Sequence, residues 1–198
     1  MQELSQYGIF EDPILTFQSW REAALQTEEN ANAFSLATAT ADGIPSNRYL
    51  LLKGLDEGKF FFFSNYLSLK AKCISENPKA EMAFYWHKEQ KQVRVFGAVE
   101  KTPREFSEKY FASRGEDSKY ASFCSIQSAP IADKAALLDK YNRARSEFPD
   151  GVECPDNWGG YYLTPQKIEF FIYGEHRLND RFVFEREGEE WKVQRVQP

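Results

Sequence analysis

The sequence predicts a mainly β, α+β fold: an antiparallel barrel decorated by helices. Aromatic residues make up 16% of the 198 residues, and their side chains suit the half-buried surface of a pleated sheet. Several apolar runs of strand length are joined by short turns, with helical segments inserted between them. The glycine motifs GxGxxG and GxxxxGK[ST] are absent, which disfavours a doubly wound parallel sheet. The length suits one domain, which we expect to span residues 1–198, with a flexible segment over residues 1–11.

The first part of the chain predicts a helix followed by three strands. Residues 12–27 start with Asp12 as N-cap and Pro13 at the first helical position, and their apolar residues recur at helical spacing. The strand-like runs follow at 33–40, 46–53 and 59–64, the first two joined by a turn.

The remainder predicts three more helices and a series of strands. Ser68 begins a short helix over 68–77, and Thr102 with Glu105 forms the capping box of a helix over 102–114. A third helix is expected over 132–148. The strands are expected at 79–87 and 91–101, as a hairpin, and in the runs WGGYYLTP, KIEFFIY, RFVFERE and EWKVQRV.

Composition argues against several classes of protein. The net charge is −5 and no stripe of Lys and Arg stands out, so nucleic-acid binding is not expected. The apolar runs are far shorter than the ~20 residues that span a bilayer, and the N-terminus does not resemble a secretory signal, so no membrane partner is expected. The three cysteines are widely spaced, which fits the reducing cytoplasm. With two histidines and no CxxC, no metal-ligand spacing is present.

Cationic side chains occur in two segments where an anion could bind. Arg48 and Lys53 flank four apolar or aromatic residues in SNRYLLLKG. Residues five apart on a regular strand face opposite sides, so these two serve separate sites, or a bulge brings them together, or both are ordinary strand-end cations. Ser68 and Lys70 lie at a helix start, which suits phosphate, although Ser68 could simply be an N-cap.

A third segment, EKYFASRGEDS, carries several hydrogen-bond donors. Tyr110 and Arg114 share a helix face, and Ser118 follows beyond Gly115, which we expect to end the helix. Phenol, guanidinium and hydroxyl groups all donate to phosphate oxygens, although a surface helix end has the same composition.

Other polar and aromatic residues admit either a ligand contact or a structural one. Gln92, Gln127 and Ser128 could bond the edge of a heterocycle or a loop, and Trp158 could wall a pocket or fill the core. The segment GEHRLNDRF at 174–182 adds Arg177 and Arg181 after an apolar strand. Together these segments offer donors for two phosphates and aromatic walls, without a nucleophile–base pair. We therefore expect a phosphorylated planar cofactor beside a small phosphorylated substrate.

The ordered motifs SNRYLLLK, FFSNYLSLKAK, EKQKQVRVFGAVEK, YFASRGEDS, SIQSAPI, NWGGYYLTPQKIEFF and GEHRLNDRF resemble the pyridoxamine 5′-phosphate oxidase family. The resemblance runs from about residue 12 to residue 198. It implies an FMN-binding split β-barrel that forms a homodimer with FMN sites at the subunit interface. It also implies oxidation of pyridoxine or pyridoxamine 5′-phosphate to pyridoxal 5′-phosphate, with O2 as electron acceptor and H2O2 as product.

The resemblance also implies roles for individual residues. The residues expected around FMN are Arg48, Tyr49, Leu50, Leu51, Lys53, Phe63, Ser64, Lys70, Gln92, Gln127, Ser128, Trp158 and Arg181. The substrate phosphate would be held by Lys53, Tyr110, Arg114 and Ser118. Arg177 would lie against the substrate ring, near the carbon that loses hydride, and Asn179 would hydrogen-bond the substrate.

Two positions depart from the family pattern. Asn179 takes the place of a substrate-contacting histidine, so binding should survive better than rate or pH profile, because an amide does not titrate near neutral pH. Leu69 stands where the family usually has an arginine beside the FMN phosphate, which predicts weaker FMN binding. These departures leave open a flavin oxidase of another substrate, such as a phenazine precursor, and a non-catalytic FMN or pyridoxal-phosphate binding protein.

Overall fold

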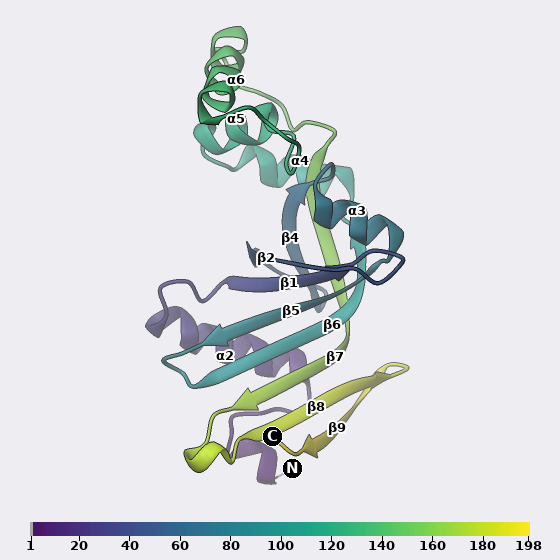
Figure 1. Cartoon of the computed structure of the whole chain (residues 1–198). Coiled ribbons are helices and arrows are strands. Elements are labelled where there is room, and N and C mark those ends of the chain that lie inside the picture. Colours follow the sequence, from purple (N-terminus) through teal and green to yellow (C-terminus); the bar gives the residue numbers. More distant parts are fainter. Residues whose placement is uncertain (1) are drawn as a thin grey trace.

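The computed structural model describes residues 2–198, which form nine strands of one antiparallel sheet with helices around it (Figure 1). The strands are β1 (Ala33–Ala39), β2 (Pro45–Leu51), β3 (Gly54–Asp56), β4 (Lys59–Asn65), β5 (Lys79–Trp86), β6 (Lys91–Lys101), β7 (Trp158–Ile172), β8 (Asp180–Glu187) and β9 (Glu190–Val196). The helices are α1 (Gln2–Ser5), α2 (Pro13–Thr27), α3 (Leu69–Glu76), α4 (Arg104–Ala112), α5 (Glu116–Cys124), α6 (Lys134–Glu147) and the 3-10 turn η1 (Glu175–Arg177). The predicted antiparallel fold with helical decoration is confirmed.

Strand β7 is the element that joins the two parts of the sheet. The strand order is β2-β1-β5-β6-β7-β4-β3, with β8 paired to β7 and β9 to β8. The first half of β7 pairs with β4 and its second half with β8, while β6 runs along nearly its whole length. The sequence predicted two strands here, but one continuous strand crosses Pro165 because the register of β6 shifts at Phe96/Gly97. A Cβ at Gly97 would lie 2.0 Å from Thr164 O, so only glycine allows this close pairing.

Helix α2 covers the inner face of the sheet and closes the core. Asp12 caps it as predicted, with Oδ1 accepting from Ile14 N at 2.8 Å. The Phe17 ring lies 4.7 Å from that of Phe60 and 5.0 Å from that of Phe84, both edge-on. Burial of these rings accounts for the high aromatic content and holds α2 on the barrel.

The predicted capping box of the helix over 102–114 is wrong. Helix α4 begins at Arg104 with Pro103 as N-cap and no side-chain cap. Thr102 still belongs to the sheet, because its N–H donates to Gly160 O at 3.0 Å, and its hydroxyl bonds Ser107 Oγ at 2.9 Å. Helix α4 ends at Ala112 with Ser113 as C-cap, before Gly115, which is instead the N-cap of helix α5; neither α5 nor the short strand β3 was predicted.

The segment over residues 1–11, which we expect to be flexible, makes contacts with the barrel in its described part. Met1 lies outside the described residues. Ile9 is only 3% exposed, the Tyr7 ring lies 5.2 Å from that of Phe182, and Trp20 Nε1 donates to Gly8 O at 3.2 Å. The described part of this segment therefore packs on the barrel, through core partners that its own short sequence does not reveal.

Candidate active site

A cavity of about 340 Å³ opens between the barrel and the helical arm, the name used here for α4, α5 and α6. Its lining comes from β2, β4, β7 and the helical arm: Leu50, Phe63, Ser64, Asn65, Arg114, Ser118, Ala121, Ser122, Ser125, Gln127 and Trp158. Seven of these residues were expected at the site. A larger cavity of about 490 Å³ lies against α3 and is lined by Ser68, but by none of the residues expected to contact FMN or substrate, so the smaller one is the candidate site.

Lys70 carries a buried amine beside this cavity. Ser68 caps α3 as predicted, and Lys70 Nζ lies 3.0 Å from Ser68 Oγ and 2.8 Å from Gln127 Oε1. Ser64 Oγ also donates to Gln127 Oε1, at 3.4 Å. Burial, and then repulsion from Arg48, lower the pKa of Lys70 from 10.5 to about 8. The amine is therefore held among neutral oxygens, where an incoming anion would stabilise its charge.

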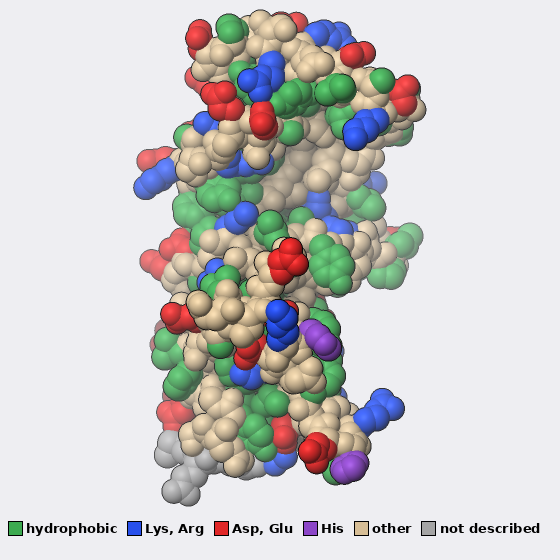
Figure 2. Space-filling model, turned by 90° about the vertical axis from the view of Figure 1, so that its left-hand side faces the viewer, with side chains coloured by type: hydrophobic (Ala, Val, Ile, Leu, Met, Phe, Trp, Pro, Cys, Tyr) green, Lys and Arg blue, Asp and Glu red, His purple; other side chains and the backbone are tan. Residues whose placement is uncertain are grey.

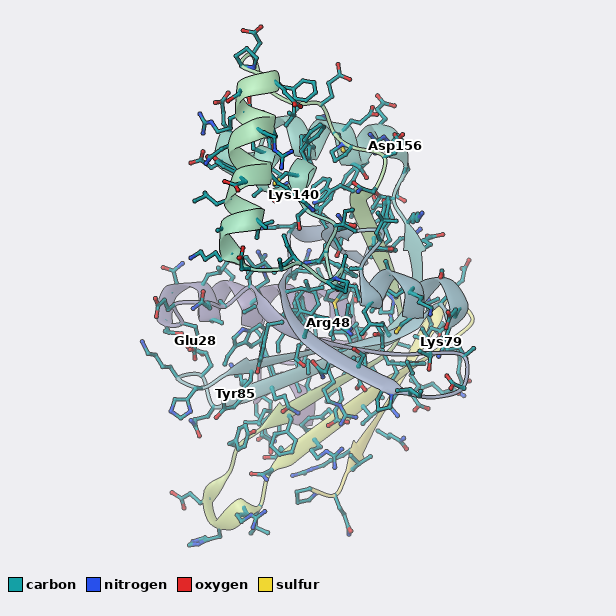
Figure 3. All side chains as sticks on the ribbon, turned by 45° about the horizontal axis from the view of Figure 1, so that its top comes forward. Glu28, Arg48, Lys79, Tyr85, Lys140 and Asp156 are labelled. Carbon is teal, nitrogen blue, oxygen red and sulfur yellow. The ribbon has the colours of Figure 1, made fainter. Side chains whose placement is uncertain are left out.

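Arg48 lies on β2, on the side of the strand that faces the core residues of β1. Its Nη1 donates to Leu36 O at 3.1 Å and to Thr38 Oγ1 at 2.8 Å, and its Nη2 donates to Ser46 Oγ. Burial lowers the pKa of this guanidinium. Figure 3 labels Arg48 on β2, which in that view lies between the helix carrying Lys140 and the strand carrying Tyr85.

Arg114 enters the cavity from the helical arm over a set of aromatic rings. Its guanidinium carbon lies 4.7 Å from the centroid of Trp158, and its Nη1 donates to Ser122 Oγ at 2.8 Å. Burial lowers the pKa of Arg114. Phe63 stacks on Tyr110, with centroids 3.9 Å apart and planes 8° apart, and the Trp158 ring is almost parallel to both. Cation and rings together can hold a charged, partly apolar ligand.

The three cations Arg48, Lys70 and Arg114 share one property. Within residues 2–198, every hydrogen-bond partner of these three side chains is a neutral oxygen, and none of the ion pairs found there includes them. Charged groups held this way are costly unless an anion binds them. The cavity therefore fits an anionic ligand, and its hydroxyl and amide groups fit phosphate oxygens in particular.

A second group of expected residues lies on the opposite face of the sheet. Gln92 alternates with the core residues Val93 and Val95 along β6, so its side chain points to the outer face. Phe171 pairs with Gln92 on one side and with Arg181 on the other. Tyr49 and Leu51 of β2 are also turned outward, with 79% and 48% of their surface exposed. The expected site is thus divided between two faces of one sheet.

Arg177 and Asn179 lie at the loop between β7 and β8, which is closed by hydrogen bonds of its own. Asn179 Oδ1 accepts from Gly174 N at 3.0 Å, and Leu178 N donates to Glu175 O at 3.0 Å. His176 and Arg177 both adopt left-handed backbone conformations, with φ of 54° and 64°. The Arg177 side chain is exposed, and the loop lies at the end of the molecule away from the helical arm (Figure 1).

The structure does not bring every expected residue to the cavity. Lys53 has an exposed side chain outside the cavity lining, and its N–H donates to Phe61 O at 3.0 Å. Ser128 Oγ accepts a hydrogen bond from Leu69 N at 3.3 Å, so Leu69 contacts Ser128 through its backbone and supplies no charge there.

Gly159 and Gly160 allow close approach of Tyr66 and Thr102, whose atoms lie 2.2 and 2.7 Å from a Cβ built at each glycine.

Sequence reasoning missed two residues of the outer face. Phe171 is the aromatic residue between Gln92 and Arg181, whereas Trp158 lies with Arg114 at the cavity. Glu169 is 3% exposed and pairs with Arg181. A single carboxylate inside the apolar run KIEFFIY was the signal that could have identified it, because a buried charge requires a partner.

Two family models match the chain. The model described as pyridoxamine 5′-phosphate oxidase matches residues 21–147, more than half of the chain. The chain belongs to the pyridoxamine 5′-phosphate oxidase family. The second model, described as the pyridoxine 5′-phosphate oxidase C-terminal dimerisation region, matches residues 158–198. That region contains β7, β8, β9 and the loop of Arg177.

Curated relatives and solved structures agree with membership of the oxidase family. The chain is 43% identical to the pyridoxine/pyridoxamine 5′-phosphate oxidase of Coxiella burnetii, over 96% of this chain and 97% of that protein. It is 38% identical to the enzyme of the same name from Haemophilus influenzae, over 98% and 93%. The crystal structure of PhzG from Burkholderia lata 383 with tetrahydrophenazine-1-carboxylic acid superimposes with a TM-score of 0.90 at 26% identity, over 96% of this chain and 94% of that one.

The surface of the described residues shows no further candidate site on the side drawn in Figure 2. On the side of the molecule drawn in Figure 2, Lys and Arg side chains are interspersed with Asp and Glu rather than gathered into one patch. In the part of the chain that the structure describes, no helix is long and apolar enough to cross a membrane.

Proposed function

We propose that this chain is an FMN-dependent pyridoxine/pyridoxamine 5′-phosphate oxidase that forms pyridoxal 5′-phosphate and H2O2, and that two copies build each FMN site. The observation that carries the proposal is the cavity lined by Arg114, with Lys70 bonded to its lining residue Gln127 and Arg48 near Lys70, because all three cations have only neutral hydrogen-bond partners. Membership of the oxidase family, and relatives named for this activity at 37–43% identity, support the reaction.

The cavity residues suit the phosphate of FMN. Lys70 supplies positive charge, and Ser64 and Gln127 supply a hydroxyl and an amide within the same hydrogen-bonded group, while Arg48 adds charge from outside that group. A bound anion would stabilise the charged form of Lys70 most, because burial disfavours that charged form in the ligand-free chain. Leu69 stands where the family usually has an arginine, so the buried amine of Lys70 would contribute a large part of the affinity for phosphate.

The division of the expected residues supports a dimeric site. Gln92 and Arg181 lie on the outer face of the sheet, and the β7–β8 loop that carries Arg177 lies at the end of the molecule away from the helical arm (Figure 1). A site built from one chain would have to draw residues from both faces of the sheet. In a two-fold dimer, the loop and outer face of one copy can meet the cavity of the other, and the match to a dimerisation region over 158–198 fits that arrangement.

Within such a site, the chain's residues would bind and orient the substrate. Bound FMN would supply the acceptor for the two electrons that leave the 4′ carbon of the substrate and pass on to O2. Arg114 and Ser118 line the cavity and would hold the substrate phosphate, with Tyr110 and Lys53 completing the clamp. Arg177 would hold the substrate ring, and Asn179 would donate its amide N–H to the ring hydroxyl, because its Oδ1 already accepts from Gly174.

A cytoplasmic location belongs to the same proposal. Cys73, Cys124 and Cys154 are all unpaired thiols, which is the state expected in a reducing compartment.

The direct test of the reaction is product formation by the purified protein saturated with FMN. Pyridoxal 5′-phosphate and H2O2 should appear in equal amounts with pyridoxine 5′-phosphate, and an aldehyde with ammonia and H2O2 from pyridoxamine 5′-phosphate. Flavin that stays bound without turnover of either vitamer would refute the oxidase assignment and favour the non-catalytic binder.

Mixed dimers test the shared site. Arg114→Gln should disable the cavity and Arg177→Gln the loop, so each homodimer should have little activity. If each site takes the cavity from one copy and the loop from the other, unfolding and refolding the two variants together should restore about a quarter of the wild-type activity, because half of the dimers carry one intact site. No recovery would show that each site lies within one chain.

The similarity to PhzG suggests a second substrate class to test, the tetrahydrophenazine carboxylic acids. That relative was solved with a phenazine precursor and is 26% identical to this chain. The cavity arginine Arg114, with Ser118 beside it in the lining, favours a phosphorylated substrate instead. Oxidation of a tetrahydrophenazine carboxylic acid at a rate above that of both phosphorylated vitamers would reverse this preference.

A further inference from the structure

Arg181 is held in one orientation by a buried carboxylate. Arg181 Nε and Nη2 donate to the two oxygens of Glu169, each at 3.1 Å, as a bidentate pair. On another side, Arg181 Nη1 donates to Gln197 O at 3.0 Å. Three of the five N–H donors of the guanidinium are therefore engaged, which leaves two for a ligand. The guanidinium carbon also lies 5.9 Å from the centroid of the Phe171 ring.

Glu169 is shared between two arginines. Its side chain is 3% exposed, and Arg94 Nη2 approaches its Oε2 at 3.2 Å from the other side. Arg94 in turn lies 3.0 Å from Glu81 Oε1 through its Nε. The four side chains form a ladder of alternating charge across β5, β6, β7 and β8, which we call the charge ladder: Glu81, Arg94, Glu169 and Arg181.

The charge ladder lies on the outer face of the sheet, among residues expected at the cofactor. Arg94 pairs with Glu169 across β6 and β7, and Gln92 and Phe171 form the neighbouring pair on the same two strands. Replacing a buried ion pair by apolar residues is often neutral or stabilising, so stability alone is a weak reason to bury Glu169 here. A bidentate carboxylate does restrict where a guanidinium points, which is the requirement of a ligand-binding arginine.

We propose that Glu169 is a positioning residue of the cofactor site. It holds Arg181 so that the two remaining N–H groups of the guanidinium face the cofactor, and Glu169 itself does not contact the ligand. The inference rests on the proposed function, because it needs Arg181 to contact FMN. Arg94 lies against Glu169 on the side away from Arg181 and balances its charge.

A double-mutant cycle on FMN affinity tests the inference. The protein is freed of flavin, and the Kd for FMN is measured by quenching of flavin fluorescence for the wild type, Glu169→Gln, Arg181→Gln and the double variant. Glu169→Gln should weaken FMN binding by about tenfold, as losses of residues that orient a ligand-binding side chain do. In the Arg181→Gln background the same change should cost no more than about twofold, because its route to the ligand is already gone.

A matched control separates positioning from general damage to the face. Glu81→Gln removes the outer end of the charge ladder without touching Arg181, and should leave the Kd for FMN within about twofold of the wild type. Glu169→Asp keeps the charge but shortens the side chain, so it should weaken FMN binding with little change in the Tm of the ligand-free protein. This variant keeps the test valid if Glu169→Gln does not fold.

Three outcomes would overturn the inference. A Glu169→Gln protein with wild-type affinity, beside a weakened Arg181→Gln protein, would refute the role of Glu169 and leave the proposed function intact. Additive losses in the double variant would show that Glu169 does not act through Arg181. Wild-type affinity of Arg181→Gln itself would refute both the contact of Arg181 with FMN and the inference built on it.

Discussion

Raising the pH through about 8 should weaken FMN binding through the buried amine of Lys70. The pKa of Lys70 is lowered to about 8 by burial and then by Arg48, so the amine is mostly charged at pH 7 and mostly neutral at pH 9. A phosphate monoester has its second pKa near ~6, so the charge of FMN phosphate does not change over this range. If only the charged amine binds phosphate, the affinity should fall by about tenfold from about pH 7 to about pH 9.

The assay is titration of the flavin-free protein with FMN, followed by fluorescence quenching, at several pH values in that range. Binding near pH 9 should also take up a proton, because phosphate restores the charge of Lys70. Lys70→Arg is the matched control, since arginine stays charged and its affinity should not change with pH. Lys70→Met should bind FMN weakly at every pH. A wild-type affinity that does not change with pH, or an equal fall in Lys70→Arg, would refute the reasoning.

The same shift in pKa has the opposite effect on the stability of the flavin-free protein. The unfolded chain holds the Lys70 proton up to about pH 10.5, while the folded chain releases it near pH 8. The cost of burying the charge is therefore present in full below pH 8 and is lost as the pH rises from 8 to 10.5. Urea unfolding should show a rising contribution to stability over that interval in the wild type, and none in Lys70→Met.

Further predictions concern turnover and folding. Arg177→Ala should lower kcat by about a hundredfold or more while FMN stays bound, because its role is toward the substrate; normal turnover would refute that role. Asn179→His should add a group that titrates near pH ~6.5 to the profile of kcat/KM, and an unchanged profile would exclude residue 179 from proton movements. Gly97→Ala should prevent folding or strongly lower the Tm, because its Cβ would lie 2.0 Å from the carbonyl oxygen of Thr164. Phe17→Ala should cost about 3–5 kcal/mol of unfolding free energy in urea, and a loss below about 1 kcal/mol would contradict its place between Phe60 and Phe84.

Local features were predictable because they depend on neighbouring residues. Asp12 and Ser68 cap their helices as expected, since the accepting oxygen and the N–H groups lie within three residues of each other. The capping box at Thr102 failed for the opposite reason. Its backbone pairs with Gly160, a residue far along the chain, and that pairing outweighs the local signal.

The contacts within the candidate site, and its division between two faces of the sheet, could be seen only in the tertiary structure. Lys70 and Gln127 are 57 residues apart and meet only because the chain returns from the helical arm to α3. Glu169 gave no sign of its partners in sequence, since Arg94 reaches it through strand pairing and Arg181 from a neighbouring strand.

The sequence by itself determined the fold class and, through ordered motifs, the family, and it supplied the residues that we propose hold phosphate. These depend on composition and on spacing along the chain, which hydrophobic periodicity and turn chemistry express directly. Only the tertiary structure decided that Arg114 lines the cavity and Lys70 bonds its lining residue Gln127, while Gln92 and Arg181 share the outer face. Side chains on a strand alternate between faces, and the face that each residue takes is set by register with partners far away in the chain.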